Sequence, residues 1–262
     1  MAYALRLSED ERARYRFMAE GARAEEHRVW AAAGIVSGAR VADIGCGPGA
    51  VLRLLAEEVG ETGRADGVDI DAGTVATAEE AIADLAQATV SVGNADASGL
   101  TPGEYDVAMC RHVLAHNGGR EATIVAHLSE LVRPGGAVYL VDIDGTTMRM
   151  YPEIPDFTDL HTRYVEFHRA QGNDITIGQT LGSLLESAGL NVEVFRVGGP
   201  VLKAPAGMRG PAWAAREAMV SAGFATTEDI ARWEAMFTRM DTLPSRPWIT
   251  IAPFVAVGRA PG

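Results

Sequence analysis

The chain has 262 residues, 47% of them hydrophobic and 22% charged, and a formal net charge of −12. These proportions are those of an ordinary folded protein, and they exclude a disordered or fibrous class. The length suits one large α/β domain with a modest insertion. The negative charge disfavours nucleic acid and anionic membranes as partners, because both are bound through clustered Lys and Arg.

No apolar core of a secretory signal opens the sequence, and no stretch is apolar for the length that spans a bilayer. We therefore expect a cytoplasmic protein. The two cysteines, Cys46 and Cys110, do not form a metal-type C-x-x-C pair, so we interpret both as reduced thiols.

The first predicted element is a long amphipathic helix that ends at Gly34. Ser8 and Glu11 have the S-x-x-E spacing of a capping box, which favours a helix start there. Gly21 could interrupt the helix. An amphipathic helix must pack on something, so residues 1–37 are interpreted as a helical cover.

From residue 40 onward the sequence alternates short β-branched runs with helical patterns. The predicted strands are 41–44, 65–70, 89–92, 105–110 and 137–142, and the predicted helices are 52–59, 74–85 and 122–132. Turn signals separate them, including the segment 133–136. Such alternation is typical of βαβ units around a parallel sheet, so we predict a doubly wound, Rossmann-like α/β fold.

Beyond residue 144 the pattern changes, with helical stretches near 159–169 and 178–188 before a strand at 192–197. A helical stretch at 211–240 and a final strand at 249–257 follow. We predict a single domain with four parts: the helical cover 1–37, a cofactor-binding core 38–144, a lid or substrate insertion 145–190, and C-terminal strands and helices 191–262.

The loop after the first predicted strand has the sequence DIGCGPGA, residues 43–50. Glycines at a strand-to-helix turn let the backbone approach a ligand closely. The spacing also satisfies the dinucleotide fingerprint G-x-G-x-x-G/A. The glycines therefore admit either NAD or S-adenosylmethionine (SAM).

Asp43 favours SAM. In a dinucleotide site the pyrophosphate rests on the helix N-terminus, close to the strand end that Asp43 occupies. A like charge at about 5 Å and an effective dielectric near 20 costs on the order of 3 kcal/mol. The ammonium group of a methionine moiety would instead gain from the carboxylate, directly or through a water.

Two further acids follow the next predicted strands. Asp69 lies 20 residues beyond Gly49 and can accept both ribose hydroxyls of a nucleoside. Asp96 can accept from an adenine amino group; the alternative is that it caps a turn. Asp71 is better interpreted as the start of the next helix, where an acid favours the dipole.

Taken together, these segments resemble the class I SAM-dependent methyltransferases of the menaquinone/ubiquinone-methylase-like kind. Five segments carry the resemblance: 43–50, 68–70, 94–97, 105–116 and 131–136. The resemblance is strong over about residues 29–142. Beyond residue 142 only the order of strands and helices is similar. The resemblance implies SAM as the cofactor, a seven-stranded sheet with an antiparallel last strand, and a variable segment before strand six.

The resemblance also implies where SAM lies. The ribose would lie on Asp69, the adenine between Ile70 and Ala97 with Asp96, and Tyr15 of the first helix would fold over the cofactor. The methionine end would contact Gly45, Cys46, Gly47 and Gly49 and lie near Cys110 and Arg111.

His112 and His116 follow the fourth predicted strand, whose carboxyl end borders the ligand crevice of an open α/β sheet. Either could act as a general base on a hydroxyl, because imidazole titrates near neutral pH. Two alternatives are that His116 only bonds loop backbone, and that in-line positioning makes a base unnecessary.

We expect no metal. Metal-assisted members of the fold place an Asp just after the fourth strand, where this chain has Cys110-Arg111-His112. Asp142 and Asp144 end the fifth strand and are interpreted as capping or solvated acids.

The predicted insertion is rich in apolar and aromatic residues, which suit a lid over a flat organic substrate, although about half of them fit plain core. They are Met148, Met150, Tyr151, Phe157, Tyr164, Phe167 and His168.

The hypothesis is SN2 methyl transfer from SAM to an oxygen, nitrogen or carbon of a small hydrophobic or aromatic metabolite in bacterial secondary metabolism. The expected partner is that small molecule, with a homodimer compatible with the sequence. The alternatives are an NAD(P)-dependent oxidoreductase, which does not explain Asp43 or Asp96, and a non-catalytic SAM-binding module. A protein methyltransferase fits less well.

Overall fold

The computed structural model describes residues 9–207 and 209–262, with side chains from residue 12. Helix α1 (Glu9–Ala33) ends where Gly34 takes a positive φ of 113°. It runs unbroken through Gly21, so the predicted interruption there is wrong. The predicted capping box involves Ser8 and lies outside the described residues.

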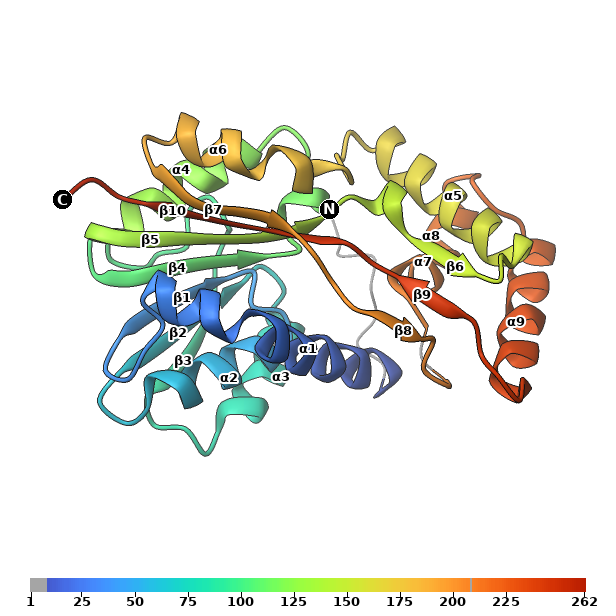
Figure 1. The fold of residues 1–262 in the computed structure, drawn as a ribbon, viewed down its shortest axis with the longest axis horizontal. Coiled ribbons are helices and arrows are strands. Elements are labelled where there is room, and N and C mark those ends of the chain that lie inside the picture. The colour runs from blue at the N-terminus through green and yellow to red at the C-terminus, as the bar shows by residue number, and fades with distance from the viewer. Residues whose placement is uncertain (1–8, 208) are drawn as a thin grey trace.

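A seven-stranded sheet forms the centre of the molecule, in the order β3-β2-β1-β4-β5-β10-β7 (Figure 1). Its first five strands are parallel, and β10 runs antiparallel to both neighbours, as predicted. The bounds are β1 (Arg40–Ile44), β2 (Arg64–Asp69), β3 (Ala88–Val92), β4 (Tyr105–Arg111), β5 (Val132–Ile143), β7 (Asn191–Val197) and β10 (Pro253–Arg259). The strand order reverses at β1, between β2 and β4, and a ligand crevice is expected at their carboxyl ends.

One predicted turn lies inside a strand. Residues 133–136 belong to β5, whose pairing with β4 jumps from Tyr105 opposite Val132 to Val107 opposite Ala137. Gly135 within this irregularity has a φ of 75°.

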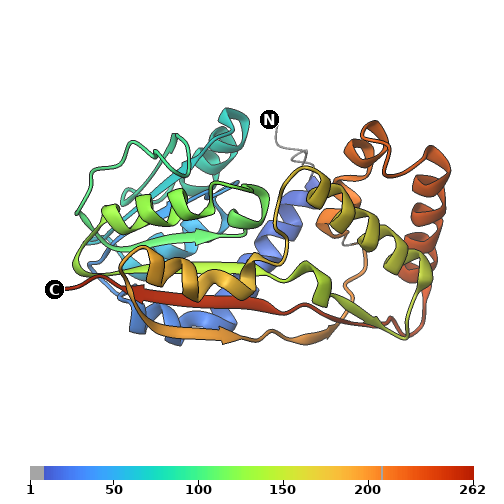
Figure 2. The same cartoon turned by 90° about the horizontal axis from the view of Figure 1, so that it is seen from above.

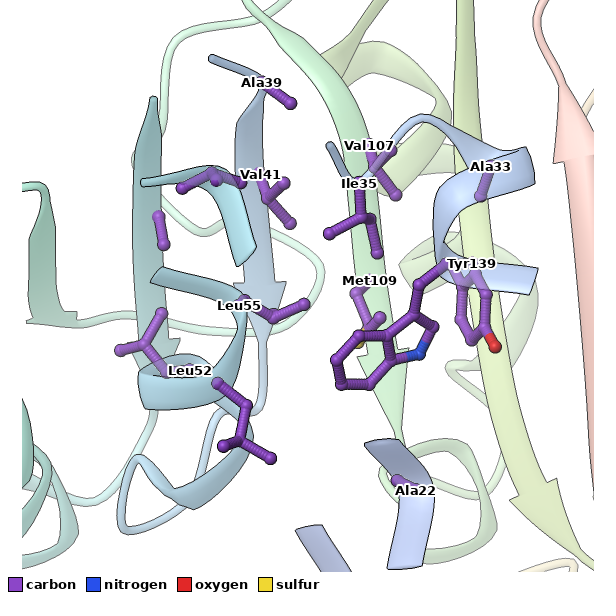
Figure 3. Packing of buried hydrophobic residues seen from close by; sticks show 14 of the residues in the cluster. Ala22, Ala33, Ile35, Ala39, Val41, Leu52, Leu55, Val107, Met109 and Tyr139 are labelled. Carbon is purple, nitrogen blue, oxygen red and sulfur yellow. The ribbon is translucent and has the colours of Figure 1, made fainter. Parts of the chain in front are cut away.

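Helices cover both faces of the sheet (Figure 2). On one face, α1 and α2 (Ala50–Val59) enclose a core with Val41, Met109 and Tyr139 of the strands (Figure 3). On the other, α4 (Glu121–Leu131) and α6 (Leu181–Ser187) pack on alternate strand residues. Helix α3 (Ala72–Ile82) borders β2 and β3.

A second lobe extends beyond the carboxyl ends of the strands (Figures 1 and 2). It has its own apolar core, centred on buried Trp233 and Met236, and its own small sheet of order β6-β9-β8. The small strands are β6 (Arg149–Tyr151), β8 (Val201–Lys203) and β9 (Trp248–Thr250). Its helices are α5 (Pro155–Ala170), α7 (Pro211–Ala214), α8 (Arg216–Ser221) and α9 (Thr227–Thr242).

Two separate stretches of chain form this lobe. The predicted insertion supplies β6 and α5, whereas β8, α7, α8, α9 and β9 all come from the connection between β7 and β10. The helical stretch predicted at 211–240 is three helices, with α9 starting at a capping box between Thr226 and Asp229. The final strand predicted at 249–257 is two strands in different sheets, β9 and β10.

Within the described part of the chain, we find no helix with the length and apolarity needed to cross a membrane.

Candidate active site

Three glycines between β1 and α2 adopt left-handed backbone conformations. Gly45, Gly47 and Gly49 have φ values of 76°, 55° and 79°. A Cβ at Gly45 would lie 2.3 Å from Val113 Cγ2, and one at Gly49 would lie 3.0 Å from Ala78 Cα. Larger residues would therefore push the loop away from its neighbours.

Asp43 is buried beneath this loop. Its side chain is 2% exposed, and its Oδ2 is a buried oxygen without a hydrogen-bond partner among the described residues. Burial raises the pKa of Asp43 to about 7; the Arg111 charge opposes this shift and the Asp69 charge adds to it. Burying an unsatisfied carboxyl oxygen destabilises a fold, so a donor is missing from this position.

Asp69 stands at the end of β2 and holds the loop. Its Oδ2 accepts from the Gly47 N–H at 3.0 Å, and its Oδ1 accepts from the Asp71 N–H at 3.0 Å. Burial raises the pKa of Asp69 against these two hydrogen bonds. The neighbouring Ile70 is exposed, as an apolar wall for a ligand would be. Asp71 caps α3 through the Thr74 N–H, confirming its predicted role.

Asp96 follows β3, and both of its oxygens accept from the Arg120 guanidinium. This contact lowers its pKa. Ala97 forms a turn by donating its N–H to Asn94 O at 3.1 Å. The carboxylate thus has a protein partner that the sequence analysis did not foresee, and its contact with adenine stays a prediction.

Arg111 ends β4 and is ion-paired with Glu26 of α1. Its Nη1 lies 2.6 Å from Glu26 Oε2, and the side chains are only 9% and 5% exposed. Glu26 also accepts from the Tyr139 hydroxyl at 2.8 Å and from Trp30 Nε1 at 3.3 Å. Cys110, one residue earlier, is buried beside Ile44 inside the sheet.

The sequence analysis missed Glu26. A signal was present, because Glu26 lies four residues after Ala22 and four before Trp30, on the buried face of α1. A carboxylate in an apolar stripe needs a buried cationic or hydrogen-bonding partner.

Tyr15 lies over the glycine loop. A Cβ built on Gly47 would be 3.7 Å from Tyr15 Cε1, so the ring packs against the open side of that glycine. The guanidinium of buried Arg14 stands 4.8 Å from the centre of the same ring. The N-terminal half of α1 therefore covers the predicted cofactor loop.

His112 has a φ of 55°, the only positive value at a non-glycine residue in the described part of the chain. Burial lowers its pKa to about 3, with the Arg111 charge contributing. Its Nδ1 is 4.0 Å from Asp142 Oδ1. Asp142 itself accepts from the Ala115 and Ile143 N–H groups, and Asp144 accepts from the Thr146 N–H, so both cap local backbone.

His116 contacts a histidine of the second lobe. Its ring centre is 4.8 Å from that of His168 in α5, which sequence reasoning treated only as a member of an aromatic set. Burial lowers the pKa of each ring to about 4. His116 is the less buried of the two. Both rings are therefore neutral at pH 7.

The predicted lid residues divide between core and surface. Met150, Tyr164 and Phe167 are buried in the lobe, whereas Tyr151 is 75% exposed. An open cavity of about 400 Å³ lies on the small sheet and contains none of the predicted site residues; it is lined by Arg149, Met150, Tyr151, Val201, Trp248 and Thr250. Among the described residues, no three His, Cys, Asp or Glu side chains are grouped to hold a metal.

Residues 41–136 match a family model described as a methyltransferase domain. This stretch is a methyltransferase domain. The matched segment contains the glycine loop, Asp69, Asp96 and both histidines after β4. The model describes the domain in general and does not select the menaquinone/ubiquinone subgroup.

One known protein is similar in sequence to part of the chain. An uncharacterised 37.1 kDa protein in transposon TN4556 of Streptomyces fradiae is 30% identical over 151 residues, which are 57% of this chain and 43% of that protein. The chain thus spans less than half of that relative's length.

Solved structures share the fold. A Bacillus halodurans protein assigned as a methyltransferase is 17% identical, covers 91% of this chain and 100% of its own, and has a TM-score of 0.59. Phosphoethanolamine N-methyltransferase 2 of Haemonchus contortus, in complex with SAM, is 14% identical, covers 87% of this chain and 50% of its own, and has a TM-score of 0.52.

The residues present fit SAM, the cofactor of this domain. The buried Asp43 oxygen lacks the donor that an ammonium group supplies. The backbone at Gly47 is open except for the Tyr15 ring. An anionic pyrophosphate would meet the Asp43 carboxyl group instead, which disfavours a dinucleotide.

Proposed function

We propose that the chain transfers a methyl group from SAM to an oxygen, nitrogen or carbon of a small, uncharged, hydrophobic or aromatic molecule. The observation that carries the proposal is the unpartnered Asp43 oxygen beneath the left-handed glycine loop. When bound, SAM supplies an electrophilic methyl group on a sulfonium.

The cofactor residues have separate roles in this proposal. Asp43 holds the ammonium group, and the backbone at Gly45 and Gly47 lies along the methionine chain. Asp69 holds the ribose, because each of its oxygens has a lone pair beyond the one given to the Gly47 or Asp71 N–H. Ile70, Ala97 and Asp96 border the adenine, and Cys46 and Gly49 shape the loop.

Tyr15, Cys110 and Arg111 support the same site from outside the loop. The Tyr15 ring shields the cofactor from solvent on the side of Gly47. Arg111 is engaged by Glu26 and acts on Asp43 through its charge. Cys110 fills the sheet beneath the site, where burial raises its thiol pKa and keeps it protonated.

The acceptor side is formed by His112 and His116 after β4 and by the second lobe. Neutral imidazoles and aromatic rings suit an uncharged acceptor, because neither carries a formal charge that an ionised group would need as its partner. The Arg14 charge lowers the pKa of both histidines, so it acts at this position.

The test is methyl transfer from methyl-labelled SAM to a panel of phenols, alcohols, amines and carbon nucleophiles, with products identified by mass spectrometry. We expect methylated product with an uncharged aromatic acceptor. Thermal shift should show stabilisation by S-adenosylhomocysteine and none by NAD or NADP. Stabilisation by NAD alone would overturn the cofactor assignment. Binding of S-adenosylhomocysteine without transfer to any acceptor class would support a non-catalytic module instead.

A further inference from the structure

A chain of hydrogen bonds joins the loop after β4 to the second lobe. The Gly118 N–H donates to Asn173 Oδ1 at 3.3 Å. The other end of the same side chain, Asn173 Nδ2, lies 3.0 Å from His168 Nδ1. His168 Nδ1 therefore faces one known end of the Asn173 side-chain amide.

The Gly118 backbone N–H fixes which end of the Asn173 amide faces His168. An N–H group can only donate, so the Asn173 atom that faces Gly118 must be the carbonyl oxygen. The amide nitrogen, which can only donate, then faces His168. His168 Nδ1 must accept, and a neutral imidazole that accepts at Nδ1 carries its proton on Nε2.

The loop after β4 and the loop after α5 pack tightly where they meet. A Cβ on Gly118 would lie 1.8 Å from the Gly172 carbonyl oxygen, so only glycine fits where the two loops meet. The Asn173 N–H donates to the His168 carbonyl at 3.0 Å, which fixes the residue at the end of α5.

The His168 ring is enclosed by other rings. Tyr164 packs edge-on against it with ring centres 4.5 Å apart, and Phe167 does so at 5.2 Å. On the remaining contacted side stands His116, at 4.8 Å between centres.

We propose that Asn173 is a positioning residue that locks His168 in its Nε2–H form, making His168 a hydrogen-bond donor and leaving His116 as the proton acceptor toward the substrate. This inference rests on the proposed function. A second proton on His168 would have to sit on Nδ1, against the Asn173 amide hydrogens, so the ring cannot serve as the base. His116 is partly exposed and has no such restriction.

For a hydroxyl acceptor the step balances. The oxygen forms its bond to the methyl carbon as the sulfur–carbon bond breaks, and the hydroxyl proton goes to His116 and then to solvent. The titratable and charged groups that act on His116 are Arg14 of α1 and His168 of α5, with His112 preceding it on the same loop.

The first test is the tautomer itself, read by ¹⁵N NMR of the histidine side chains in the full chain. In the wild-type protein we expect His168 Nδ1 to have the shift of an unprotonated nitrogen and Nε2 that of a protonated one. Asn173→Asp keeps the shape and the acceptor for Gly118, but it offers His168 a carboxylate, so the proton should move to Nδ1. Asn191→Asp at the exposed start of β7 is the matched control and should leave His168 unchanged. A wild-type His168 protonated on Nδ1 would overturn the proposal.

The second test separates the two histidines by kinetics. Loss of a general base lowers the rate by about 10²- to 10⁴-fold. We expect kcat to fall by this factor in His116→Gln and by a smaller factor in His168→Gln. Asn173→Asp should shift the pH profile of kcat. S-adenosylhomocysteine affinity should stay within about twofold in all three variants. Wild-type kcat in His116→Gln would refute the role of His116, and the NMR result holds even if no methyl acceptor is found.

Discussion

Asp43 shows at the scale of one residue how function opposes stability. The carboxyl group is enclosed by the fold, and one of its oxygens has no donor among the described residues. Its neighbour Asp69 is held by two backbone N–H groups, whereas Asp43 Oδ2 accepts from none and its pKa is lowered by the Arg111 charge. The proposed ammonium group would supply the donor that this oxygen lacks.

We expect Asp43→Asn to stabilise the free protein and to weaken cofactor binding. The folded pKa of Asp43 is about 7, above the ordinary 3.8, so its contribution to stability is present at low pH and lost as the pH rises through 7. The amide variant should therefore have a higher Tm than the wild type at pH 8, and the difference should shrink as the pH falls from 7 toward 3.8. The control Glu61→Gln changes an exposed acid and should not alter Tm. A lower Tm for Asp43→Asn at pH 8 would contradict the desolvation argument.

The same pKa predicts how cofactor affinity depends on pH. Only the ionised carboxylate attracts an ammonium group, so S-adenosylhomocysteine affinity should fall as the pH drops below about 7. Calorimetry between pH 5.5 and 7 should also detect proton release on binding. The Asp43→Asn variant should bind weakly with a flat profile, and an unchanged affinity would refute the role of Asp43.

Helix α1 shows at the scale of an element how a cover is attached to a sheet. Its C-terminal half packs on β5 and α2 and carries Glu26 into the ion pair with Arg111, while its N-terminal half brings Tyr15 to the glycine loop. One helix thus connects the structural core with the predicted cofactor site. The ion pair fixes the rotation of the helix and hence the direction of Tyr15.

We expect Glu26→Gln to destabilise the protein by about 3–5 kcal/mol, because it leaves a buried guanidinium without its charge partner. Denaturant unfolding measures the loss, and limited proteolysis should show earlier cleavage within α1. The adjacent Glu25→Gln is the matched control, since the Glu25 side chain is exposed. Equal free energies of unfolding for the two variants would show that the Glu26–Arg111 ion pair does not stabilise the fold.

The whole molecule consists of a sheet domain and a lobe with separate apolar cores. The lobe is joined to the sheet by short connections from β5 to β6, from β7 to β8 and from β9 to β10 (Figure 1). The predicted cofactor residues all belong to the sheet domain or α1. The lobe contributes His168 and Asn173, which lie on the proposed acceptor side.

This division predicts that damage to the lobe spares the cofactor. Trp233 is 0% exposed at the centre of the lobe, and replacing a buried Trp by Ala costs about 3–5 kcal/mol. We expect Trp233→Ala to lose methyl transfer while it keeps S-adenosylhomocysteine affinity within about threefold. The milder Trp233→Phe should have a methyl-transfer activity between those of the wild type and Trp233→Ala. Trp248→Ala is the control within the same lobe, because Trp248 is 44% exposed. Loss of cofactor binding in Trp233→Ala would mean that the two parts unfold together.

The sequence alone determined the parallel part of the sheet and the glycine loop, because each depends on residues that are close together in the chain. The antiparallel last strand was expected only from the family resemblance, since its partners in β5 and β7 are distant in sequence. Hydrophobic periodicity and turn residues act over a few positions, and the order of Asp43, Asp69 and Asp96 along three strands needs no knowledge of packing. Even the role of Asp71 as a helix cap was readable from its neighbours.

Only the tertiary structure decided the partners of the buried polar groups and the origin of the lobe. Glu26 and Arg111 are 85 residues apart, and Gly118 and Asn173 are 55 apart. Nothing in either segment specifies the other, because such contacts are fixed by how two surfaces pack. The same reason explains why residues 249–257 gave one predicted strand and two observed ones: the segment passes from the small sheet to the large one, and only the assembled sheets show where.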